Sequence, residues 1–347
     1  MDSGNRTDGR GPKVTIRQVA ELAGVSIATV SRVVNDRSDV SSKTREAVRR
    51  VMLEQGYHAN PKTWPGVAAR TGLVGVTMPV IHHGYFAAIL SGAAEALYDH
   101  DMRIVLCPTR HEHDREVSLL ERLSRGETDG AILVLPEESN DELTTLTRHG
   151  FRFVVVDPFS EPAEGLPVVS AAHSSGATQA TCFLLELGHR RIAVITGPEG
   201  GMATEERLRG YHAALATAGI MPDACLVVRS NFRVDGGLES AARLLDLPDR
   251  PSAVFAFNDS MAIGVLQAAR ARGLAVPGDL SVVGFDDTVE AVIAVPALTT
   301  VRQPLAEMGR MAVGLLLRLL DNRRLEPLRV QLATKLVVRD STAPPRS

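Results

Sequence analysis

The sequence predicts an α/β protein, with a small three-helix unit followed by a larger body of two lobes with parallel sheets. Two observations predict this fold class. Between residues 14 and 56 apolar residues recur at helical spacing, whereas beyond residue 72 short β-branched runs alternate with longer amphipathic stretches. This alternation indicates βαβ units, and residues 73–347 are too many for a usual single sheet. We therefore expect two lobes rather than one.

The composition is that of an ordinary globular protein. Of 347 residues, 44% are hydrophobic and 23% are charged, which excludes a mainly disordered chain, a collagen-like repeat and a disulfide-stapled miniprotein. No run approaches the ~18 apolar residues that span a bilayer, and the polar first residues lack the apolar stretch of a signal peptide. The three cysteines lack CxxC spacing, which favours a reducing compartment. We expect a cytoplasmic protein with no membrane partner.

Charge is unevenly distributed along the chain. Residues 1–60 carry ten Lys and Arg against seven Asp and Glu, a net charge of +3, whereas residues 61–347 carry 28 against 34, a net charge of −6. A basic amino-terminal unit on an acidic body is typical of a nucleic-acid-binding module joined to a second domain. A solvated basic surface would give the same excess.

The amino-terminal unit contains three predicted helices after a polar tail, residues 1–12, that we expect to be disordered. The first helix would end at Ala23, Gly24 would supply a tight turn, and the second helix would run to about Val34. A hydroxyl residue that can act as N-cap precedes each helical pattern. These residues are Thr15, Ser26, and Ser41 or Ser42.

The body begins after a predicted linker. Residues 57–72 contain two prolines and two glycines, which favours a linker over a helix or strand. Seven β-branched runs then predict strands that begin near residues 73, 103, 130, 153, 191, 252 and 281. Amphipathic stretches predict helices near residues 86–100, 115–125, 174–188, 204–218, 236–246 and 260–272. Strands that are connected through helices run parallel, so we expect parallel sheets.

Residues 14–51 have the pattern of a helix-turn-helix with a third, supporting helix. In such a unit the second helix enters the DNA major groove, while hydroxyl and N–H groups contact phosphates. Ile27, Ala28 and Arg32 lie outside the apolar stripe of the second helix and would face the bases. Short polar residues in the expected DNA-binding set are Thr15, Ser26, Thr29, Ser31 and Asn35. A three-helix core with an ordinary polar face is the alternative interpretation.

Several runs of the sequence resemble one protein family. Ala20–Asn35, Val40–Val48 and Gly56–Pro61 are similar to the helix-turn-helix headpiece of LacI/GalR-family transcriptional regulators. Segments of the body are similar to the same family, at residues 109–133, 187–197, 206–215, 255–287 and 296–313. The resemblance spans about residues 14–340.

The resemblance implies a DNA-binding domain, a hinge, and a periplasmic-binding-protein-like body that binds a small-molecule effector and dimerises. These parts would occupy residues 13–60, 61–72 and 73–340. The first lobe would comprise about residues 73–159 and 302–328, and the second about residues 160–301 and 329–340. The segment 302–328 would cross back to the first lobe, so that the lobes share three connections.

The resemblance also implies which residues are functional. The family's base-reading pair falls on Ile27 and Ala28, and Arg32 could contact a guanine bidentately. The family's effector positions fall on Asp157, Arg207, Phe232, Asn258 and Asp286, with Tyr85 and Phe86 as an apolar wall. Carboxylate, guanidinium and amide groups bind vicinal hydroxyls in pairs, and an aromatic ring covers the C–H face of a sugar.

The predicted hinge departs from the family pattern. The family has a hinge helix with an A-R-x-L pattern, whereas this chain has Thr63-Trp64-Pro65-Gly66 shortly after Asn60. Pro65 disfavours a helix, and Gly66 has no side chain to insert into a minor groove. We therefore expect an extended or partly helical hinge.

The start of the second lobe departs from the family as well. The Asp-Asn pair that is common there is Ala172-His173 in this chain. Because alanine cannot cap a helix, we expect Ser174 or Ser175 to supply the cap instead.

Motifs of catalysis are lacking in the sequence. His111-Glu112-His113 does not have HExxH spacing, so we expect no metal site there. The run GPEGG at residue 197 lacks the Lys-Ser/Thr of a phosphate loop, and neither GxSxG nor a GxGxxG after a strand occurs. We expect no enzymatic activity and no cofactor.

The sequence therefore predicts a homodimeric, DNA-binding transcriptional repressor with a pseudo-palindromic operator and a small-molecule effector. A sugar or sugar derivative is the first expectation for the effector, and a nucleobase or nucleoside is the second. Assembly into tetramers, and whether the effector releases or recruits DNA, stay open. A sugar-binding transport or sensor protein is the alternative for the body. Such a protein would be expected to have a signal peptide and to lack the DNA-binding headpiece.

Overall fold

The computed structural model describes residues 15–34, 40–54, 70–81, 83–321 and 329–346. The chain divides into two compact units, Met1–Arg70 and Thr71–Ser347. The predicted tail, Asn35 and the hinge residues lie outside the described residues. The hinge residues concerned are Asn60, Thr63, Trp64, Pro65 and Gly66.

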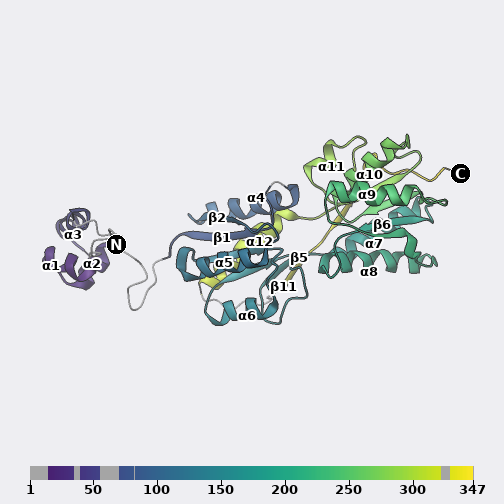
Figure 1. Cartoon of the computed structure of the whole chain (residues 1–347). Coiled ribbons are helices and arrows are strands. Elements are labelled where there is room, and N and C mark those ends of the chain that lie inside the picture. The colour runs from purple at the N-terminus through teal and green to yellow at the C-terminus, as the bar shows by residue number, and fades with distance from the viewer. Residues whose placement is uncertain (1–14, 35–39, 55–69, 82, 322–328, 347) are drawn as a thin grey trace, which may run out of the picture. The chain divides into compact units, whose positions relative to one another are not determined.

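The amino-terminal unit consists of α1 (Ile16–Leu22), α2 (Ile27–Val34) and α3 (Ser42–Glu54) (Figure 1). Gly24 adopts a φ of +64° in the turn between α1 and α2, a conformation that costs glycine least. The predicted N-caps are confirmed, because the hydroxyls of Thr15, Ser26 and Ser41 accept hydrogen bonds from the N–H groups of Gln18, Thr29 and Thr44. The small core of the unit comprises Val19, Ala20, Val30, Val33 and Val48.

The first lobe is built on a six-stranded parallel sheet with the order β11-β5-β4-β3-β1-β2. Its strands are β1 (Leu73–Met78), β2 (Arg103–Pro108), β3 (Gly130–Val134), β4 (Phe153–Val156), β5 (Val168–Ala171) and β11 (Arg329–Leu332). Its helices are α4 (Gly84–Tyr98), α5 (His113–Arg122), a π-helical turn (Leu123–Glu127), α6 (Asn140–Arg148) and α12 (Leu305–Leu320).

Helices cover both faces of this first sheet. Along β3, Ile132 and Val134 pack into the cluster that contains α4 and α12, whereas Ala131 and Leu133 pack into the cluster of α5 and α6. This alternation follows from the two-residue period of a strand, and it explains why β3 is apolar throughout. The helices α4 and α12 can approach closely because Gly92 has no Cβ. A Cβ at this position would collide with the α12 backbone.

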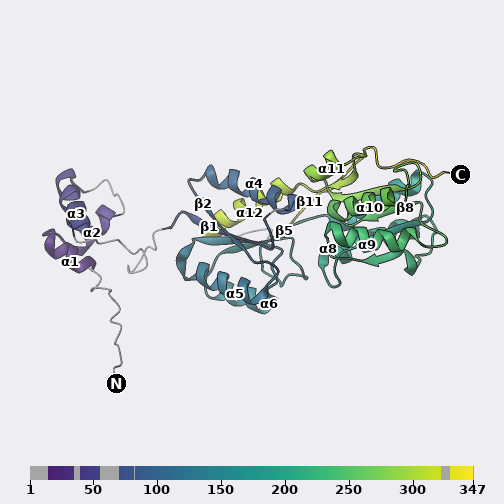
Figure 2. The same cartoon turned by 45° about the horizontal axis from the view of Figure 1, so that its top comes forward.

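The second lobe is built on a six-stranded sheet with the order β12-β10-β9-β8-β6-β7, in which β12 runs antiparallel to β10. Figure 2 labels β8 of this sheet and the helices α8, α9, α10 and α11 of the same lobe. Its strands are β6 (Ile192–Thr196), β7 (Val227–Arg229), β8 (Ala253–Ala256), β9 (Ser281–Asp286), β10 (Thr299–Arg302) and β12 (Lys335–Val337). Its helices are α7 (His173–Glu186), α8 (Met202–Thr217), a 3-10 turn (Ala224–Leu226), α9 (Val234–Leu245), α10 (Asp259–Ala271) and α11 (Val289–Ile293). The helices pack in pairs, α7 with α8 and α9 with α10.

The strands differ from the predicted lobe ranges in two places. The range 160–301 assigned β5 to the second lobe, and the range 329–340 assigned β11 to it, but both strands pair within the first sheet, where Val168 is opposite Arg329. Sequence periodicity did not reveal β5 because the strand has only four residues and lies directly before α7. The chain passes between the sheets after β5, after β10 and between β11 and β12.

The predicted cap of α7 is also wrong. The helix begins at His173, its N-cap residue is Ala172, and no side chain caps it. His173 is instead buried at the start of the helix, where the chain has just left the first sheet. Ser174 and Ser175 lie within the helix.

Candidate functional site

The second helix of the amino-terminal unit presents the residues that were predicted to contact bases. Ile27, Ala28 and Arg32 are exposed, and the opposite face of α2 buries Val30 and Val33 in the core. The exposed fraction of Ile27 is 43%, which is high for an isoleucine. The geometry leaves one face of α2 available to a groove of DNA.

The predicted phosphate-contacting hydroxyls lie around the start of the same helix. Ser26 is exposed, whereas Thr29 and Ser31 are half-buried. The Ser26 Oγ and Thr29 Oγ1 are 2.9 Å apart and hydrogen-bonded to each other, in addition to the N-cap contact. Thr15 is exposed at the start of α1, where its N–H and hydroxyl both donate to the Gln18 side chain.

In the body, Asp157 receives hydrogen bonds from three directions. It directly follows β4 and is buried. The Tyr85 hydroxyl donates to its Oδ2 at 2.5 Å, the Ala171 N–H donates to its Oδ1 at 3.3 Å, and His173 Nε2 lies 3.3 Å from the same Oδ1. Burial alone would raise the pKa of the Asp157 carboxyl, but His173, Tyr85 and Arg207 together lower it. Asp157 is therefore ionised in this interior.

Arg207 brings a positive charge to the same place from α8. Its side chain is buried, which lowers its pKa, and its guanidinium lies 3.9 Å over the ring of Phe285. One terminal nitrogen donates to the Phe257 carbonyl, and the other lies 3.3 Å from His173 Nδ1. The Arg207 Nε is buried without a hydrogen-bond partner. A guanidinium held in this way has a donor left for a ligand.

Asp286 completes this group from the carboxyl end of β9. Its Oδ1 accepts a hydrogen bond of 2.6 Å from Gln303 Nε2 and lies 4.0 Å from an Arg207 nitrogen. Burial raises the pKa of the Asp286 carboxyl well above its usual value, and Asp259 adds to this rise while Arg207 opposes it. Asp286 is thus less firmly ionised than Asp157.

Three of the predicted effector residues have an unusual backbone. The φ angle is +48° at Asp157, +61° at Phe232 and +120° at Asp286. Positive φ is uncommon for residues other than glycine, and such strain concentrates at binding sites. It follows that the fold enforces the positions of these side chains.

Asn258 and Phe232 support each other. The Asn258 Oδ1 caps α10 by accepting from the Met261 N–H at 2.8 Å, and its Nδ2 donates to the Phe232 carbonyl at 2.9 Å. The Phe232 ring lies where a side chain at Gly197 would be. The amide of Asn258 is therefore occupied in positioning the loop of Phe232.

The predicted apolar wall comprises two buried rings. Tyr85 and Phe86 meet edge to face with their centroids 5.1 Å apart. His83 caps α4, and its Nε2 lies 2.9 Å from the Ser260 hydroxyl of the second lobe. His83, two residues before the wall, therefore connects the lobes.

The structure brings two residues into the group that sequence reasoning missed, His173 and Gln303. His173 links Asp157 to Arg207, and Gln303 binds Asp286. The signal for His173 was its place in the Asp-Asn pair of the family, which was interpreted only as a missing cap. For Gln303 the sequence offered no signal beyond its position after β10.

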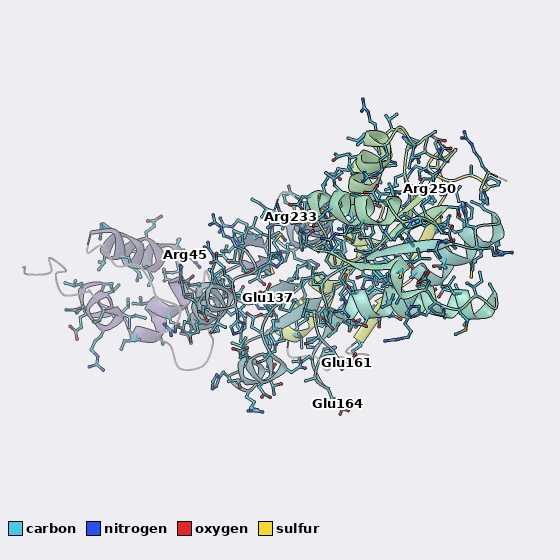
Figure 3. All side chains as sticks on the ribbon, turned by 45° about the vertical axis from the view of Figure 1, so that its right-hand side comes forward. Arg45, Glu137, Glu161, Glu164, Arg233 and Arg250 are labelled. Carbon is cyan, nitrogen blue, oxygen red and sulfur yellow. The ribbon has the colours of Figure 1, made fainter. Side chains whose placement is uncertain are left out.

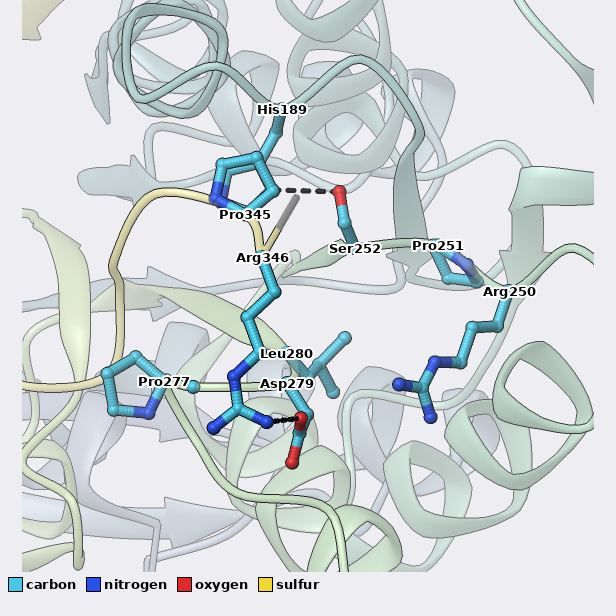
Figure 4. Close-up of a pocket in the computed structure, with 10 residues that line it drawn as sticks. His189, Arg250, Pro251, Ser252, Pro277, Asp279, Leu280, Pro345 and Arg346 are labelled. Carbon is cyan, nitrogen blue, oxygen red and sulfur yellow. Dashed lines mark hydrogen bonds and ion pairs between the residues drawn. The ribbon is translucent and has the colours of Figure 1, made fainter.

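A cavity of about 200 Å³ lies beside the amino ends of two inner strands of the second sheet, β8 and β9 (Figure 4). Ser252 and Leu280 line it and directly precede β8 and β9, so it opens at the amino ends of these strands. His189 and Ser252 are hydrogen-bonded at 2.8 Å, and Arg346 is paired with Asp279. Asp157 and Asp286, by contrast, lie at carboxyl ends of strands, so this cavity is separate from the predicted effector residues.

The histidines of the His111-Glu112-His113 run are bound to different carboxylates. His111 Nδ1 lies 2.9 Å from Glu137, which Figure 3 labels, and His113 Nε2 lies 3.1 Å from Glu142. Among the described residues, no group of three or more His, Cys, Asp and Glu side chains could hold a metal ion. In the same part of the chain, no helix is long and apolar enough to cross a membrane.

Models of two families match the chain. The model of bacterial regulatory proteins of the lacI family matches residues 15–60, and that of the periplasmic binding protein-like domain matches residues 181–342. The chain is 35% identical to the HTH-type transcriptional regulator DegA of Bacillus subtilis, over 96% of this chain and 99% of that protein. It is 37% identical to the HTH-type transcriptional regulator CelR of Thermobifida fusca, over 94% of this chain and 98% of that protein.

Solved structures agree with these relatives. The transcriptional regulator CelR in complex with cellobiose has a TM-score of 0.73 at 37% identity, over 95% of this chain and all of that chain. The lac repressor dimer bound to operator has a TM-score of 0.75 at 27% identity, over 96% of this chain and all of that chain. Headpiece and body are thus both matched over almost their whole length. The chain belongs to the lacI family of bacterial transcriptional regulators.

Proposed function

We propose that the chain is a homodimeric, cytoplasmic repressor whose operator affinity changes when a small sugar binds between its lobes. One observation carries the proposal, namely the buried polar chain Tyr85–Asp157–His173–Arg207, which links side chains of both lobes. In open α/β sheets, ligands bind outside the carboxyl ends of the strands, where Asp157 follows β4. We propose no catalytic role for these residues.

The chemistry of this group suits a neutral sugar. Asp157 and Asp286 can accept from hydroxyls, Arg207 can donate to them, and the rings of Tyr85 and Phe86 can cover a C–H face. Two solved family members support this ligand class, since one is a cellobiose complex and another has bound ribose. We propose that Asp157, Arg207 and Asp286 contact the effector and that Asn258 positions Phe232 beside it.

Contacts between the lobes give the effector a means of control. The His83 ring binds Ser260 at 2.9 Å, and the Met202 N–H donates to the Phe159 carbonyl at 2.7 Å. Both contacts join a residue of the first lobe to one of the second. A ligand that favours one arrangement of the lobes changes DNA affinity by its differential affinity for the two states.

We propose that α2 is the recognition helix, with Ile27 and Ala28 against thymine methyls and Arg32 against a guanine. Thr15, Ser26, Thr29 and Ser31 would contact the phosphates. A twofold dimer presents two such helices, so the operator would be a pseudo-palindrome.

Thermal unfolding of the full chain in the presence of candidate ligands tests the effector class. Cellobiose, ribose and a nucleoside are the probes, and a ligand at 100 times its dissociation constant stabilises by about 2.7 kcal/mol. We expect a sugar to raise the unfolding temperature. At the same ligand concentration, Arg207→Ala and Asp286→Ala should reduce this stabilisation to about a third and leave DNA binding intact, because each loses a hydrogen bond to a charged group, about 2 kcal/mol.

Selection from a random DNA pool tests the DNA-binding part independently. A pseudo-palindromic sequence is the expected product. A sugar proposal is contradicted if only the nucleoside stabilises the chain, and the location of the site is contradicted if both variants keep wild-type ligand affinity.

A further inference from the structure

Asp259 is a buried carboxyl that has no part in the effector contacts proposed above. It is the first residue of α10, and its exposed fraction is 1%. Its Oδ1 accepts from the Thr300 hydroxyl at 2.6 Å, and its Oδ2 accepts from the Thr288 N–H at 2.8 Å and the Thr288 hydroxyl at 3.3 Å. The fold makes room for it, since a Cβ at Gly284 would collide with Asp259 Oδ1. Asp259 thus binds β10 and the turn that follows β9.

This turn, residues 286–288, has a backbone that its surroundings must enforce. The φ angle is +120° at Asp286 and +63° at Asp287, and positive φ is costly for residues other than glycine. Asp287 is held by an ion pair with Arg302, and Thr288 is held by Asp259. Strained turns persist only where such contacts over-determine them. Asp259 therefore supports the turn that carries Asp286.

The same turn lies against the first lobe. A Cβ at Gly84, the first residue of α4, would lie 3.2 Å from Thr288 Cβ, 3.4 Å from Thr288 Cγ2 and 2.8 Å from Glu290 Oε2. The preceding residue, His83, lies 2.9 Å from the hydroxyl of Ser260 in α10. The start of α4 is thus in direct contact with the turn and with the start of α10.

We propose that Asp259 is a positioning residue that fixes two features at once, the place of Asp286 in the effector site and the contact of Thr288 with α4. Tyr85, the second residue of α4, donates to Asp157 at 2.5 Å, so a displaced turn would disturb the site from both lobes. This inference rests on the proposed function, because it assumes that the effector contacts Asp286.

Loss of this support should weaken effector binding although Asp259 does not touch the effector. Backbone strain of this kind favours competing conformations of the turn by about tenfold once the hydrogen bonds that offset it are removed. The apparent affinity of a ligand falls by the same factor as the population of its binding-competent state. We therefore expect affinity to fall about tenfold.

Two variants of Asp259 separate position from charge. Asp259→Ala removes all acceptors, whereas Asp259→Asn can accept from the Thr288 N–H and donate to the Thr300 hydroxyl, which rotates to accept. Burial raises the pKa of the Asp259 carboxyl to about 7, so its neutral form already occurs at neutral pH. For cellobiose or ribose, calorimetry should show the tenfold loss in Asp259→Ala and near wild-type affinity in Asp259→Asn.

Asp129→Ala is the matched control for these measurements. The Asp129 carboxylate accepts from the N–H groups of Thr71 and Gly72 and from the Thr71 hydroxyl, so the variant loses the same kinds of hydrogen bonds. Asp129 precedes β3, at the amino end of the strand, whereas the effector residues lie at carboxyl ends. Its replacement should leave sugar affinity as in the wild type.

Gly84→Val tests the same contact from the first lobe. The added side chain has no space beside Thr288, so the turn must move away from α4. The helix itself is retained, because valine has a better helix propensity than glycine. We expect a lower sugar affinity, by about tenfold, in a chain that still unfolds cooperatively.

Hydrogen exchange of the ligand-free chain tests the inference without any effector. Asp259→Ala should raise amide exchange at Thr288 and also in the first turn of α4, whereas Asp259→Asn and Asp129→Ala should leave α4 as in the wild type. A rise confined to the second lobe would overturn the inference. Wild-type sugar affinity in Asp259→Ala or Gly84→Val, or equal losses in the two Asp259 variants, would do the same. If no sugar binds the wild type, the proposed function fails while the exchange of α4 still decides the inference.

Discussion

At the residue scale, the interior of the first lobe holds two carboxyl groups that share one small space. Glu116 is on α5 and Glu138 follows β3, and both are buried. Glu116 Oε2 accepts from the Glu137 N–H at 3.0 Å. Burial raises the pKa of Glu138 to about 8, with a further contribution from the charge of Glu116. The pair therefore holds a proton at neutral pH.

This shared proton predicts how stability depends on pH. The folded chain binds the proton more tightly than the unfolded chain, so the stabilisation is complete below the usual pKa of 4.5 and is lost as pH rises through about 8. We expect Glu138→Gln to flatten the dependence, because its neutral amide can donate to Glu116 at every pH. Urea unfolding between about pH 5 and pH 8 should show the wild-type free energy falling by at most about 1.4 kcal/mol per pH unit from this source.

Glu164→Gln provides the control for this measurement, since Glu164 is an exposed carboxyl of the same lobe (Figure 3). It should leave the pH dependence as in the wild type. Equal slopes in Glu138→Gln and the wild type would show that the buried pair does not hold the proton.

The candidate effector site shows how far residue patterns reach. Asp157, Arg207 and Asp286 were predicted from the resemblance to the LacI/GalR family, and the structure brings them together. His173 was overlooked because its importance comes from contacts with residues 16 and 34 positions away, which no local pattern encodes. Long-range contacts of single polar side chains are the part of the site that a sequence conceals.

At the element scale, the sequence predicts long or strongly periodic segments best. The headpiece helices follow from hydroxyl caps and apolar spacing, because both signals are local. The strand β7 has three residues and β5 has four, too few for a period to appear. Their existence depends on neighbouring strands, Val194 opposite Val227 for one and Val155 opposite Val168 for the other. Short strands of this kind are recognised only when the sheet is known.

The recognition helix α2 yields a prediction about DNA readout. If Arg32 contacts a guanine, Arg32→Ala should cost about 1–3 kcal/mol of binding free energy per half-site and relax base preference at one symmetric position. Titrations of operator variants, followed by fluorescence anisotropy, measure both effects.

Arg50→Ala is the matched control for this helix, because Arg50 is an exposed arginine on α3. A loss of affinity that is uniform across DNA sequences is expected there, if there is any loss, because only phosphate contacts could change. Wild-type affinity and base preference in Arg32→Ala would remove Arg32 from the set of base-reading residues.

At the scale of the whole molecule, the two lobes act as a pair because three chain segments and several side-chain contacts join them. His83 with Ser260 and His173 with Asp157 both connect the lobes. An effector that exchanges these contacts for its own shifts the arrangement of the lobes. The signal can reach DNA only if two headpieces are held at a fixed spacing, which requires dimerisation.

An exposed apolar patch on the second lobe is the surface that we expect a second copy to cover. It comprises Val289, Val292 and Ile293 of α11 and the nearby Val295, and the exposed fractions reach 71% at Ile293 and 93% at Val295. Contiguous apolar side chains with this exposure mark interaction surfaces. Burial of each such side chain contributes about 1.5–3 kcal/mol, so the patch can stabilise a dimer substantially.

The double change Val289→Asp and Ile293→Asp should therefore convert the dimer to a monomer and weaken operator binding, since a single headpiece contacts one half-site. Sedimentation equilibrium measures the first effect and DNA titration the second. Met221→Asp is the control, because Met221 is an apolar residue with 85% exposure that does not belong to the patch. If the double variant sediments as a dimer and binds its operator like the wild type, the two copies associate through another surface. If it sediments as a monomer and still binds the operator with full affinity, dimerisation is not what sets the spacing of the headpieces.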